Sequence, residues 1–306
     1  MTKKTKIIVI SLSILFLAIV AVGYYAYDLN QDINETVEKI YEPLERGEIS
    51  QKRTEPLNIK ETHQPISILL LGVDQRPGDR GRSDTIVVLT INPEDKSMYM
   101  FNIPRDTRTR IVGKGFDDKI NHAYAFGGVN MALETVENFL DIPIDYYAQV
   151  NLEGFVSIID IIGGVSIDVK QDFDYEGHSF RMGTTQMDGE TALKYSRMRY
   201  QDPKGDLGRN ERQQQIIKAL MKKAASVQTI TKVDEILGEV SSHVRTNLKK
   251  EDMDHLRKNY LEATKNHQSL HIQGGGQKIN GVYYYVVPED ERQRVSNTLK
   301  EHLKLK

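Results

Sequence analysis

Two aspartates lie close together in the sequence, between segments that have the composition of buried strands. Asp74 follows the apolar run ISILLLGV at residues 66–73, and Asp84 precedes the apolar run TIVVLTIN at residues 85–92. Open α/β sheets bind ligands where their strands end, so we expect both carboxylates at one edge of a sheet. Magnesium uses one or two protein carboxylates and completes its shell with water and phosphate oxygens. The pair therefore suits a divalent cation, the alternative being that these aspartates only cap turns of the loop between them.

Arginines gather in loops that end strands or begin helices. The planar guanidinium group of arginine can hold two phosphate oxygens at once. The formal net charge of the chain is only −2, so a local gathering of arginines indicates a directed anion site. Taken singly, each arginine could serve only solubility, but together they favour a phosphate ligand. The candidates, with one lysine and one glutamine, are Arg82, Arg105, Arg108, Lys119, Arg197, Arg199, Arg209 and Gln213.

Composition and missing motifs exclude several classes of protein. The chain has no cysteine, which excludes a disulfide scaffold, a thiolate zinc site and a cysteine nucleophile. The 41 basic residues are balanced by 43 acidic residues, so a generally basic protein that coats nucleic acid is excluded as well. The sequence contains neither the nucleophile elbow of hydrolases nor the phosphate loop of nucleotide-binding proteins.

An uncharged apolar run of 21 residues occupies positions 7–27. A helix rises about 1.5 Å per residue, so this run can just span a hydrocarbon core of about 30 Å. Lys3, Lys4 and Lys6 precede the run and acidic residues follow it. The positive-inside rule then predicts a single-pass protein with residues 1–6 in the cytoplasm and everything after residue 27 outside. A cleaved signal peptide is the alternative.

The elements that must position these side chains alternate between strands and helices. Such alternation predicts an α/β fold, a central sheet with helices on both faces. Strands are expected at 66–73, 85–92, 97–103, near 150 and at 165–169, and helices from Asn130, at 152–162, at 189–196 and at 209–225. Residues 28–65 read as an extracytoplasmic stalk or, equally, as a helix packed on the main domain.

Residues 226–306 form a further segment that packs on the domain or completes it. Two helical stretches, a turn at Gly274-Gly275-Gly276, a strand at 283–287 and a last helix from Pro288 are expected in it.

Five stretches of the chain resemble the LytR-CpsA-Psr family of bacterial cell-envelope proteins. They are LLLGVDQRPGDRGRSDTI (69–86), NIPRDTR (102–108), DKINHAYAFGG (118–128), IPIDYYAQVNLEGFVSIIDIIGGV (142–165) and GETALKYSRMRYQDPKGDLGRNERQQQ (189–215). The resemblance identifies residues 66–225 as the catalytic domain and implies a three-layer α-β-α sandwich with a mixed sheet. It also implies a membrane-anchored transferase of a bacterial envelope, resembling those of Gram-positive organisms.

The resemblance further implies the reaction and the roles of the site residues. An anionic glycopolymer, with wall teichoic acid favoured, would pass from a polyprenyl-pyrophosphate carrier to the C6 hydroxyl of N-acetylmuramic acid in peptidoglycan. Asp74 and Asp84 would hold Mg²⁺, with Mn²⁺ as the alternative ion. The clamp on the pyrophosphate would be Arg82, Arg105, Arg197, Arg199, Arg209 and Gln213, with Lys119 at its rim and Arg108 as a weaker candidate. The residues themselves do not identify the general base: Asp74 or Asp106 could serve, and Asp74 cannot easily be both the base and a tightly held metal ligand. No nucleic acid is expected as a partner.

A polyprenyl chain held outside the bilayer needs apolar shelter, because each buried CH₂ is worth about 0.8 kcal/mol. We expect an apolar groove between the sheet and the helices at 130–140 and 152–162. Its predicted walls are Val136, Leu140, Phe155, Val156 and Ile159.

Two other functions remain open at this stage. With water as acceptor the same site would be a lipid-pyrophosphate phosphatase. A membrane-anchored transcriptional regulator is the candidate from another class, and the predicted topology disfavours it.

Overall fold

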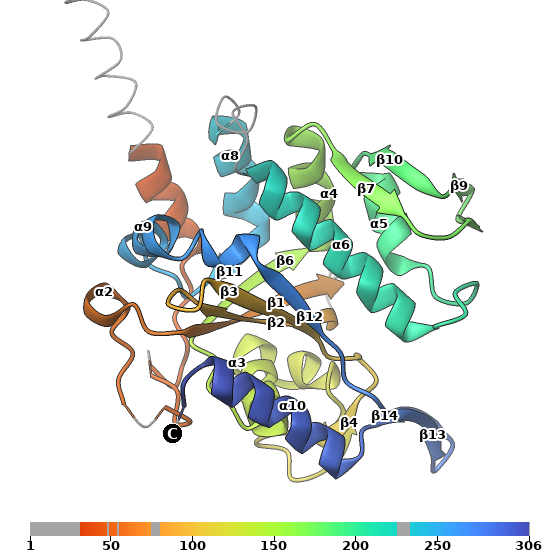
Figure 1. Ribbon diagram of the computed structural model, residues 1–306, viewed down its shortest axis with the longest axis horizontal. Helices are drawn as coiled ribbons and strands as arrows, with labels where there is room; N and C mark the ends of the chain where they lie inside the picture. The colour runs from red at the N-terminus through yellow and green to blue at the C-terminus, as the bar shows by residue number, and fades with distance from the viewer. Residues whose placement is uncertain (1–30, 48, 54, 75–79, 225–232, 306) are drawn as a thin grey trace, which may run out of the picture.

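Six strands form one mixed sheet at the centre of the computed structural model, which describes residues 31–305 apart from 48, 54, 75–79 and 225–232 (Figure 1). Across the sheet the strands are β11 (Val244–Thr246), β6 (Tyr146–Asn151), β1 (Ile66–Asp74), β2 (Arg82–Asn92), β3 (Ser97–Asn102) and β12 (His267–Leu270). The β1–β2, β2–β3 and β6–β11 pairs are antiparallel, whereas β6 runs parallel to β1 and β12 runs parallel to β3. The expected central mixed sheet is therefore present.

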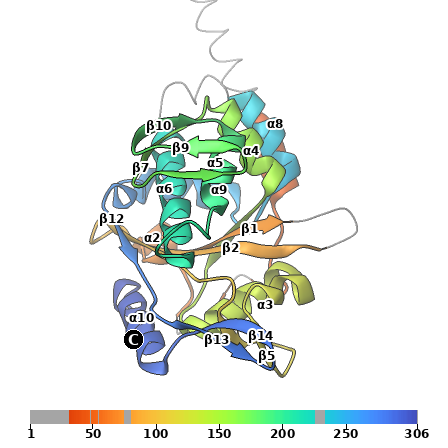
Figure 2. The same cartoon turned by 90° about the vertical axis from the view of Figure 1, so that its right-hand side faces the viewer.

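Helices cover both faces of this sheet, which gives three layers (Figure 2). On one face lie α3 (His122–Leu140) and α10 (Glu289–His302). On the other face lie α4 (Leu152–Ile161), α5 (Gly189–Arg197), α6 (Asp206–Ala224), α8 (Val233–His243) and α9 (Lys250–Asn259).

The central strands are apolar on both faces because both faces are covered. Leu69 and Leu71 belong to the core beneath α3 and α10, whereas Ile66 and Val87 belong to the core on the opposite face. Side chains alternate between the faces of a strand, so a strand covered on both sides must be apolar at nearly every position. This explains the continuous apolar run at 66–73.

Four small two-stranded sheets surround the central one. They are β4 (Arg108–Arg110) with β5 (Asp117–Lys119), β7 (Val165–Val169) with β10 (Gly183–Met187), β8 (Phe173–Tyr175) with β9 (His178–Phe180), and β13 (Gly275–Ile279) with β14 (Val282–Val286). The region around β7 and β10 has its own apolar core, closed by α4, α5 and α6.

Helix α3 begins eight residues before the expected start at Asn130, at His122. The backbone leaves the helical conformation at Gly127 and Gly128, and Gly128 has φ of 64°. This pair kinks the helix, which explains why the sequence around it resembles a turn.

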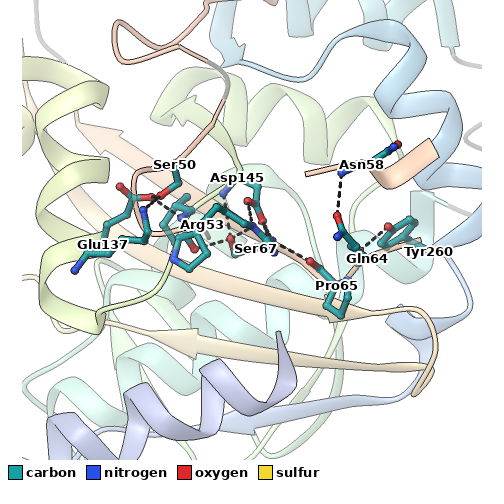
Figure 3. A network of polar contacts seen from close by, with 12 residues as sticks. Ser50, Arg53, Asn58, Gln64, Pro65, Ser67, Glu137, Asp145 and Tyr260 are labelled. Atoms are coloured by element: carbon teal, nitrogen blue, oxygen red, sulfur yellow. Dashed lines mark hydrogen bonds and ion pairs between the residues drawn. The ribbon is translucent and has the colours of Figure 1, made fainter. Parts of the chain in front are cut away.

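The segment at 28–65 is packed on the domain over most of its described length, which corrects the interpretation as a free stalk. Residues 31–40 are helical, and Val37, Ile40 and Leu44 are buried. Further along, Ser50 donates a hydrogen bond to Glu137 at 2.6 Å, and Arg53 makes two hydrogen bonds to Asp145 at 2.6 and 2.8 Å (Figure 3).

The C-terminal segment completes the central sheet, since it supplies both edge strands, β11 and β12. The expected turn at Gly274–Gly276 is incorrect, because Gly275 and Gly276 begin β13. The turn lies instead at Asn280-Gly281, where both residues have positive φ, as two-residue hairpin loops require. The Asn-Gly pair is the signal that identifies it.

None of the helices within the described ranges is long and apolar enough to cross a membrane. The span expected at 7–27 lies outside those ranges.

Candidate active site

A cavity of about 660 Å³ opens where β1 ends and β2 begins. Asp74 is the last residue of β1, and Asp84 lies near the start of β2. In the pairing of β1 with β2, Gly72 lies opposite Thr85 and Val73 lies opposite Ser83. Asp84 therefore has no residue opposite it and is the extra residue of a β-bulge. A bulge changes the direction of a side chain relative to the regular alternation. Asp74 and Asp84 both line the cavity.

Seven of the polar residues predicted for the site line this one cavity, although they come from five separate segments of the chain. They are Asp74, Asp84, Arg105, Arg197, Arg199, Arg209 and Gln213. The strand-end argument therefore locates the polar part of the cavity correctly.

The end of α5 directs two of the arginines. Met198 ends this helix with an extended backbone (φ −55°, ψ 134°), and its side chain is fully buried. Alternate residues of an extended segment point to the same side, so burial of Met198 turns Arg197 and Arg199 together towards the cavity. Arg209 and Gln213 lie one turn apart on α6 and complete the arginine-rich wall.

Each buried or half-buried cation at the mouth has a carboxylate partner. Arg105 contacts Asp84 at 2.9 Å. A single carboxylate, Asp206, contacts both Arg199 at 2.9 Å and Arg209 at 3.0 Å. The mouth of the cavity is therefore a network of alternating charges and not a bare cationic patch.

The pKa shifts of two arginines reflect this network. Burial by itself would lower the pKa of Arg105, but Asp84 and Asp106 outweigh it and the pKa rises. The pKa of Arg209 is lowered, first by burial and also by the charges of Arg105 and Arg199 nearby. Arg209 is 5% exposed, and its Nε has no hydrogen-bond partner among the described residues. A buried donor of this kind is suited to an anionic ligand.

The remaining predicted residues lie beside the cavity without lining it. Lys119 contacts the buried carboxylate of Asp106 at 2.7 Å, and the Nε of Arg105 is 3.9 Å from the same carboxylate. Arg108 is paired with Asp117 at 2.9 Å, and Arg82 is exposed, with its backbone opposite Asp74 in the sheet. Asp106 and Lys119 thus adjoin the arginine network, whereas the structure does not bring Arg82 and Arg108 into it.

Three residues that contribute to the site are absent from the sequence-based prediction. Asp206 precedes Arg209 by three positions on α6, a spacing from which their ion pair could have been predicted. Arg212 is buried and ties the loop after α5 to α6 through Asp202. The ring of Tyr283 lies 5.9 Å from the guanidinium carbon of Arg199. No local pattern reveals Tyr283, because only the folded hairpin brings it to the site.

The interior of the cavity is apolar. Its walls come from the sheet, from α4 and from α6, and include Leu70, Ala148, Val150, Leu152, Phe155, Ile158, Ile216, Ile217, Leu220 and Met221. One cavity therefore has an arginine-rich part at the strand ends and an apolar part along α4 and α6.

The predicted apolar walls are corrected by this arrangement. Phe155 lines the cavity, but Val136 and Leu140 are buried in the core on the opposite face of the sheet. Ile159 is buried in the separate core around β7, and Val156 does not line the cavity. The wall of the cavity that we expected from α3 is formed by α6. The apolar periodicity of a helix shows which of its sides is buried, but not which face of a sheet the helix covers.

The cavity offers two carboxylates to a hard divalent cation that takes the rest of its shell from phosphate and water, and one of them, Asp84, also pairs with Arg105. No group of three or more potential metal-ligating histidine, cysteine or acidic side chains occurs among the described residues. Asp74 and Asp84 line the same cavity, and the side chain of Asp84 is 38% exposed. Two accessible carboxylates are as many as Mg²⁺ ordinarily takes from a protein.

Known proteins resemble this chain over nearly its whole length. A transferase from Halalkalibacterium halodurans, named polyisoprenyl-teichoic acid–peptidoglycan teichoic acid transferase TagU, is 47% identical over 304 residues, which cover 99% of each chain. The crystal structure of B. subtilis TagU is 40% identical, with a TM-score of 0.66 over 79% of this chain and 98% of that one. A structure of TagT bound to LIIa-WTA is 32% identical, with a TM-score of 0.75 over 87% and 100%. The profile of the LytR_cpsA_psr family matches residues 27–301, and the chain belongs to this family.

Proposed function

We propose that the protein is a transferase that moves a teichoic acid from a polyprenyl-pyrophosphate carrier to peptidoglycan. The observation that carries the proposal is the single cavity with an arginine-lined mouth and an apolar interior. A lipid-linked pyrophosphate has the same division, a doubly phosphorylated head and a hydrocarbon tail. The names of the similar transferases support this substrate class.

The reaction is a phosphotransfer. The glycopolymer moves with its phosphate to the C6 hydroxyl of N-acetylmuramic acid, which is the acceptor. The hydroxyl oxygen forms a bond to the phosphorus that carries the glycan, and the bond from that phosphorus to the bridging oxygen breaks. Polyprenyl phosphate leaves with the electron pair of the broken bond. Arg105, Arg199 and Arg209 neutralise the charge that develops on the departing phosphate, which is the main contribution proteins make to such reactions.

The proton of the attacking hydroxyl passes to a carboxylate at the mouth, Asp74 or Asp106. Asp106 is buried and ion-paired with Lys119, and protonation would break that pair. The contacts of Asp106 with Lys119 and Arg105 give it a role in holding these two cations in place.

Asp74 and Asp84 would hold Mg²⁺, with Mn²⁺ as the alternative ion. The ion would supply positive charge to the phosphate oxygens that the arginines leave uncovered.

We propose that residues 7–27 anchor the protein in the cell membrane of a Gram-positive bacterium, with the catalytic domain outside. A reporter enzyme fused after Lys306 and active only outside the cytoplasm tests this orientation. Activity of the reporter only in the cytoplasm would contradict both the topology and the reaction.

The deciding experiment combines the purified full-length protein, a lipid-linked teichoic acid precursor and peptidoglycan strands. We expect glycopolymer to become attached to peptidoglycan. This attachment should be lost after chelation of the metal ion and in the variants Asp74→Ala and Asp84→Ala. Asp254→Ala is the matched control, because Asp254 is exposed on α9, does not line the cavity and pairs with Arg257 at 3.9 Å. Release of free glycopolymer without attachment would instead identify a phosphatase.

A further inference from the structure

The hairpin of β13 and β14 is docked on the loop that carries Arg105 and Asp106. The backbone N–H of Tyr285 donates to the carbonyl of Asp106 at 2.8 Å, and Thr107 forms a parallel bridge with Tyr285. The hydroxyl of Tyr284 lies 3.4 Å from a carboxylate oxygen of Asp118 on β5. Backbone contacts therefore fix the position of the hairpin relative to the anion-binding loop.

Gly274, which precedes β13, and Gly276 of β13 make room for tyrosine rings of β14. A Cβ atom on Gly276 would lie 2.7 Å from Cε2 of Tyr283, and a Cβ on Gly274 would lie 2.8 Å from Cε1 of Tyr285. Real Cβ atoms essentially never approach other heavy atoms so closely. A Cβ on Gly275, between them, would meet nothing within 4 Å. The rings of Tyr283 and Tyr285 thus lie across the two outer glycines of the Gly-Gly-Gly motif.

In this position the half-buried ring of Tyr283 contacts two cations at the site. Lys119 Nζ is 6.0 Å from the centre of the ring, and the guanidinium carbon of Arg199 is 5.9 Å from it. The two cations belong to different segments, and each has its own carboxylate partner, Asp106 and Asp206. The ring of Tyr283 thus lies beside both ion pairs, whereas the ring of Tyr200, 5.7 Å from Arg199, lies beside the exposed end of only one of them.

We propose that Tyr283 is a positioning residue that holds Lys119 and Arg199 in place for the phosphate groups of the donor. The attraction between each cation and the ring lowers the freedom of both side chains without neutralising their charge. A carboxylate partner alone would hold each cation but would also compete with the phosphate for it. This inference rests on the proposed function and assigns to the C-terminal hairpin a part in binding the donor.

The first test compares Tyr283→Phe with Tyr283→Leu in the full-length protein. The ring that attracts cations is kept in the first variant and lost in the second. We expect Tyr283→Leu to raise KM for the lipid-linked donor and Kd for inorganic pyrophosphate about fivefold. The kcat should change less than about twofold, because the phosphates make the same contacts once bound. Tyr283→Phe should restore wild-type values.

The second test moves the ring without removing it. In Gly276→Ala the new Cβ must displace Tyr283, and we expect the same rise in KM and in Kd for pyrophosphate as in Tyr283→Leu. Gly275→Ala is the matched control, since its Cβ enters open space, and both constants should stay at wild-type values. A melting temperature near wild type in all four variants would show that the losses come from the site and not from unfolding.

The outcomes separate this inference from the proposed function. Equal Kd values for pyrophosphate in wild type, Tyr283→Leu and Gly276→Ala would overturn the inference and leave the transferase intact. Weaker binding of the donor with unchanged binding of pyrophosphate would also overturn it, because Tyr283 would then contact the sugar. A wild-type protein that binds neither compound would refute the proposed function and the inference together.

Discussion

At the scale of single residues, the cavity mouth keeps its cations in place with carboxylates before any phosphate arrives. Arg105 is held by Asp84, and Asp206 holds both Arg199 and Arg209. A phosphate ligand that enters the mouth must share these partners or replace them. The side chains are thereby preorganised, so little conformational entropy remains to be lost on binding.

Replacement of Arg105 or Arg199 by lysine tests whether geometry matters beyond charge. Lysine keeps the positive charge but loses the planar fork that holds two oxygens, so we expect kcat/KM to fall by about 1–3 kcal/mol in free-energy terms. Arg181→Lys is the control, since Arg181 pairs with Asp174 at the exposed surface and does not line the cavity. Equal kcat/KM values for wild type and the two site variants would show that only bulk charge acts there.

The polar part of the site could be predicted from sequence, because strand ends and loop arginines are local features. Asp74, Asp84 and Arg105 follow or precede apolar strands, and all three line the cavity. Arg108 has the same local signal, yet it pairs with Asp117 beside the cavity. Tyr283 has no such signal, since its place depends on a backbone contact between Tyr285 and Asp106. Residues brought together by contacts distant in sequence cannot be recognised from local patterns.

At the scale of elements, the predicted strands and most helices agree with the structure, whereas the face that each helix covers does not follow from sequence. Helices α3 and α6 are both long, and only the path of the chain decides that α6 borders the cavity. The apolar faces of both helices would be compatible with either side of the sheet. The lipid shelter is therefore expected along α4 and α6.

A charge placed on α4 tests this shelter. We expect Phe155→Asp to slow transfer from a long-chain polyprenyl donor at least about tenfold, because each sheltered CH₂ is worth about 0.8 kcal/mol. A short-chain donor should be affected far less. Met182→Asp serves as the control, since Met182 is 69% exposed and does not line the cavity. Equal slowing of both donors by Phe155→Asp would contradict a tail-binding role.

Two ion pairs of different burial hold the segment at 46–65 to the domain. Breaking each pair should therefore lower the free energy of unfolding by a different amount. The side chains of Arg53 and Asp145 are 6% and 3% exposed, and removal of one partner leaves a buried charge unpaired. We expect Arg53→Met to lower the free energy of unfolding by about 3–5 kcal/mol. Lys52→Met breaks the exposed pair with Asp141 and should cost less than about 1 kcal/mol. Denaturant unfolding of the full-length protein measures the loss of unfolding free energy in both variants. Losses of similar size would contradict the view that the Arg53 pair contributes more than the Lys52 pair.

At the scale of the whole molecule, a residue that precedes the first strand shares one apolar core with the C-terminal segment. Leu44 belongs to the same buried cluster as Leu299 and Leu303 of the C-terminal segment. His302 joins α10 to the sheet, because its ring nitrogens contact Thr90 at 2.8 Å and Ser97 at 2.9 Å. The C-terminal segment is therefore part of the domain core and not an appendage.

The buried ring of His302 predicts a loss of stability in mild acid. Burial lowers the pKa of His302 below its ordinary value of 6.5, although Asp95 opposes the shift. The unfolded chain therefore takes up this proton first as the pH falls, so the contribution is complete above pH 6.5 and is lost below it. In His302→Gln we expect a smaller decrease in the free energy of unfolding between neutral and mildly acidic pH. Identical pH profiles for wild type and the variant would contradict this role.

The place of β11 and β12 at the two edges of the sheet has a consequence for synthesis of the protein. The ribosome produces β1, β2, β3 and β6 first, and until residues 244–270 follow, β6 and β3 each expose a row of unpaired backbone groups. Exposed strand edges pair readily with other chains. We therefore expect a nascent chain to need protection from aggregation until residues 244–270 have been added.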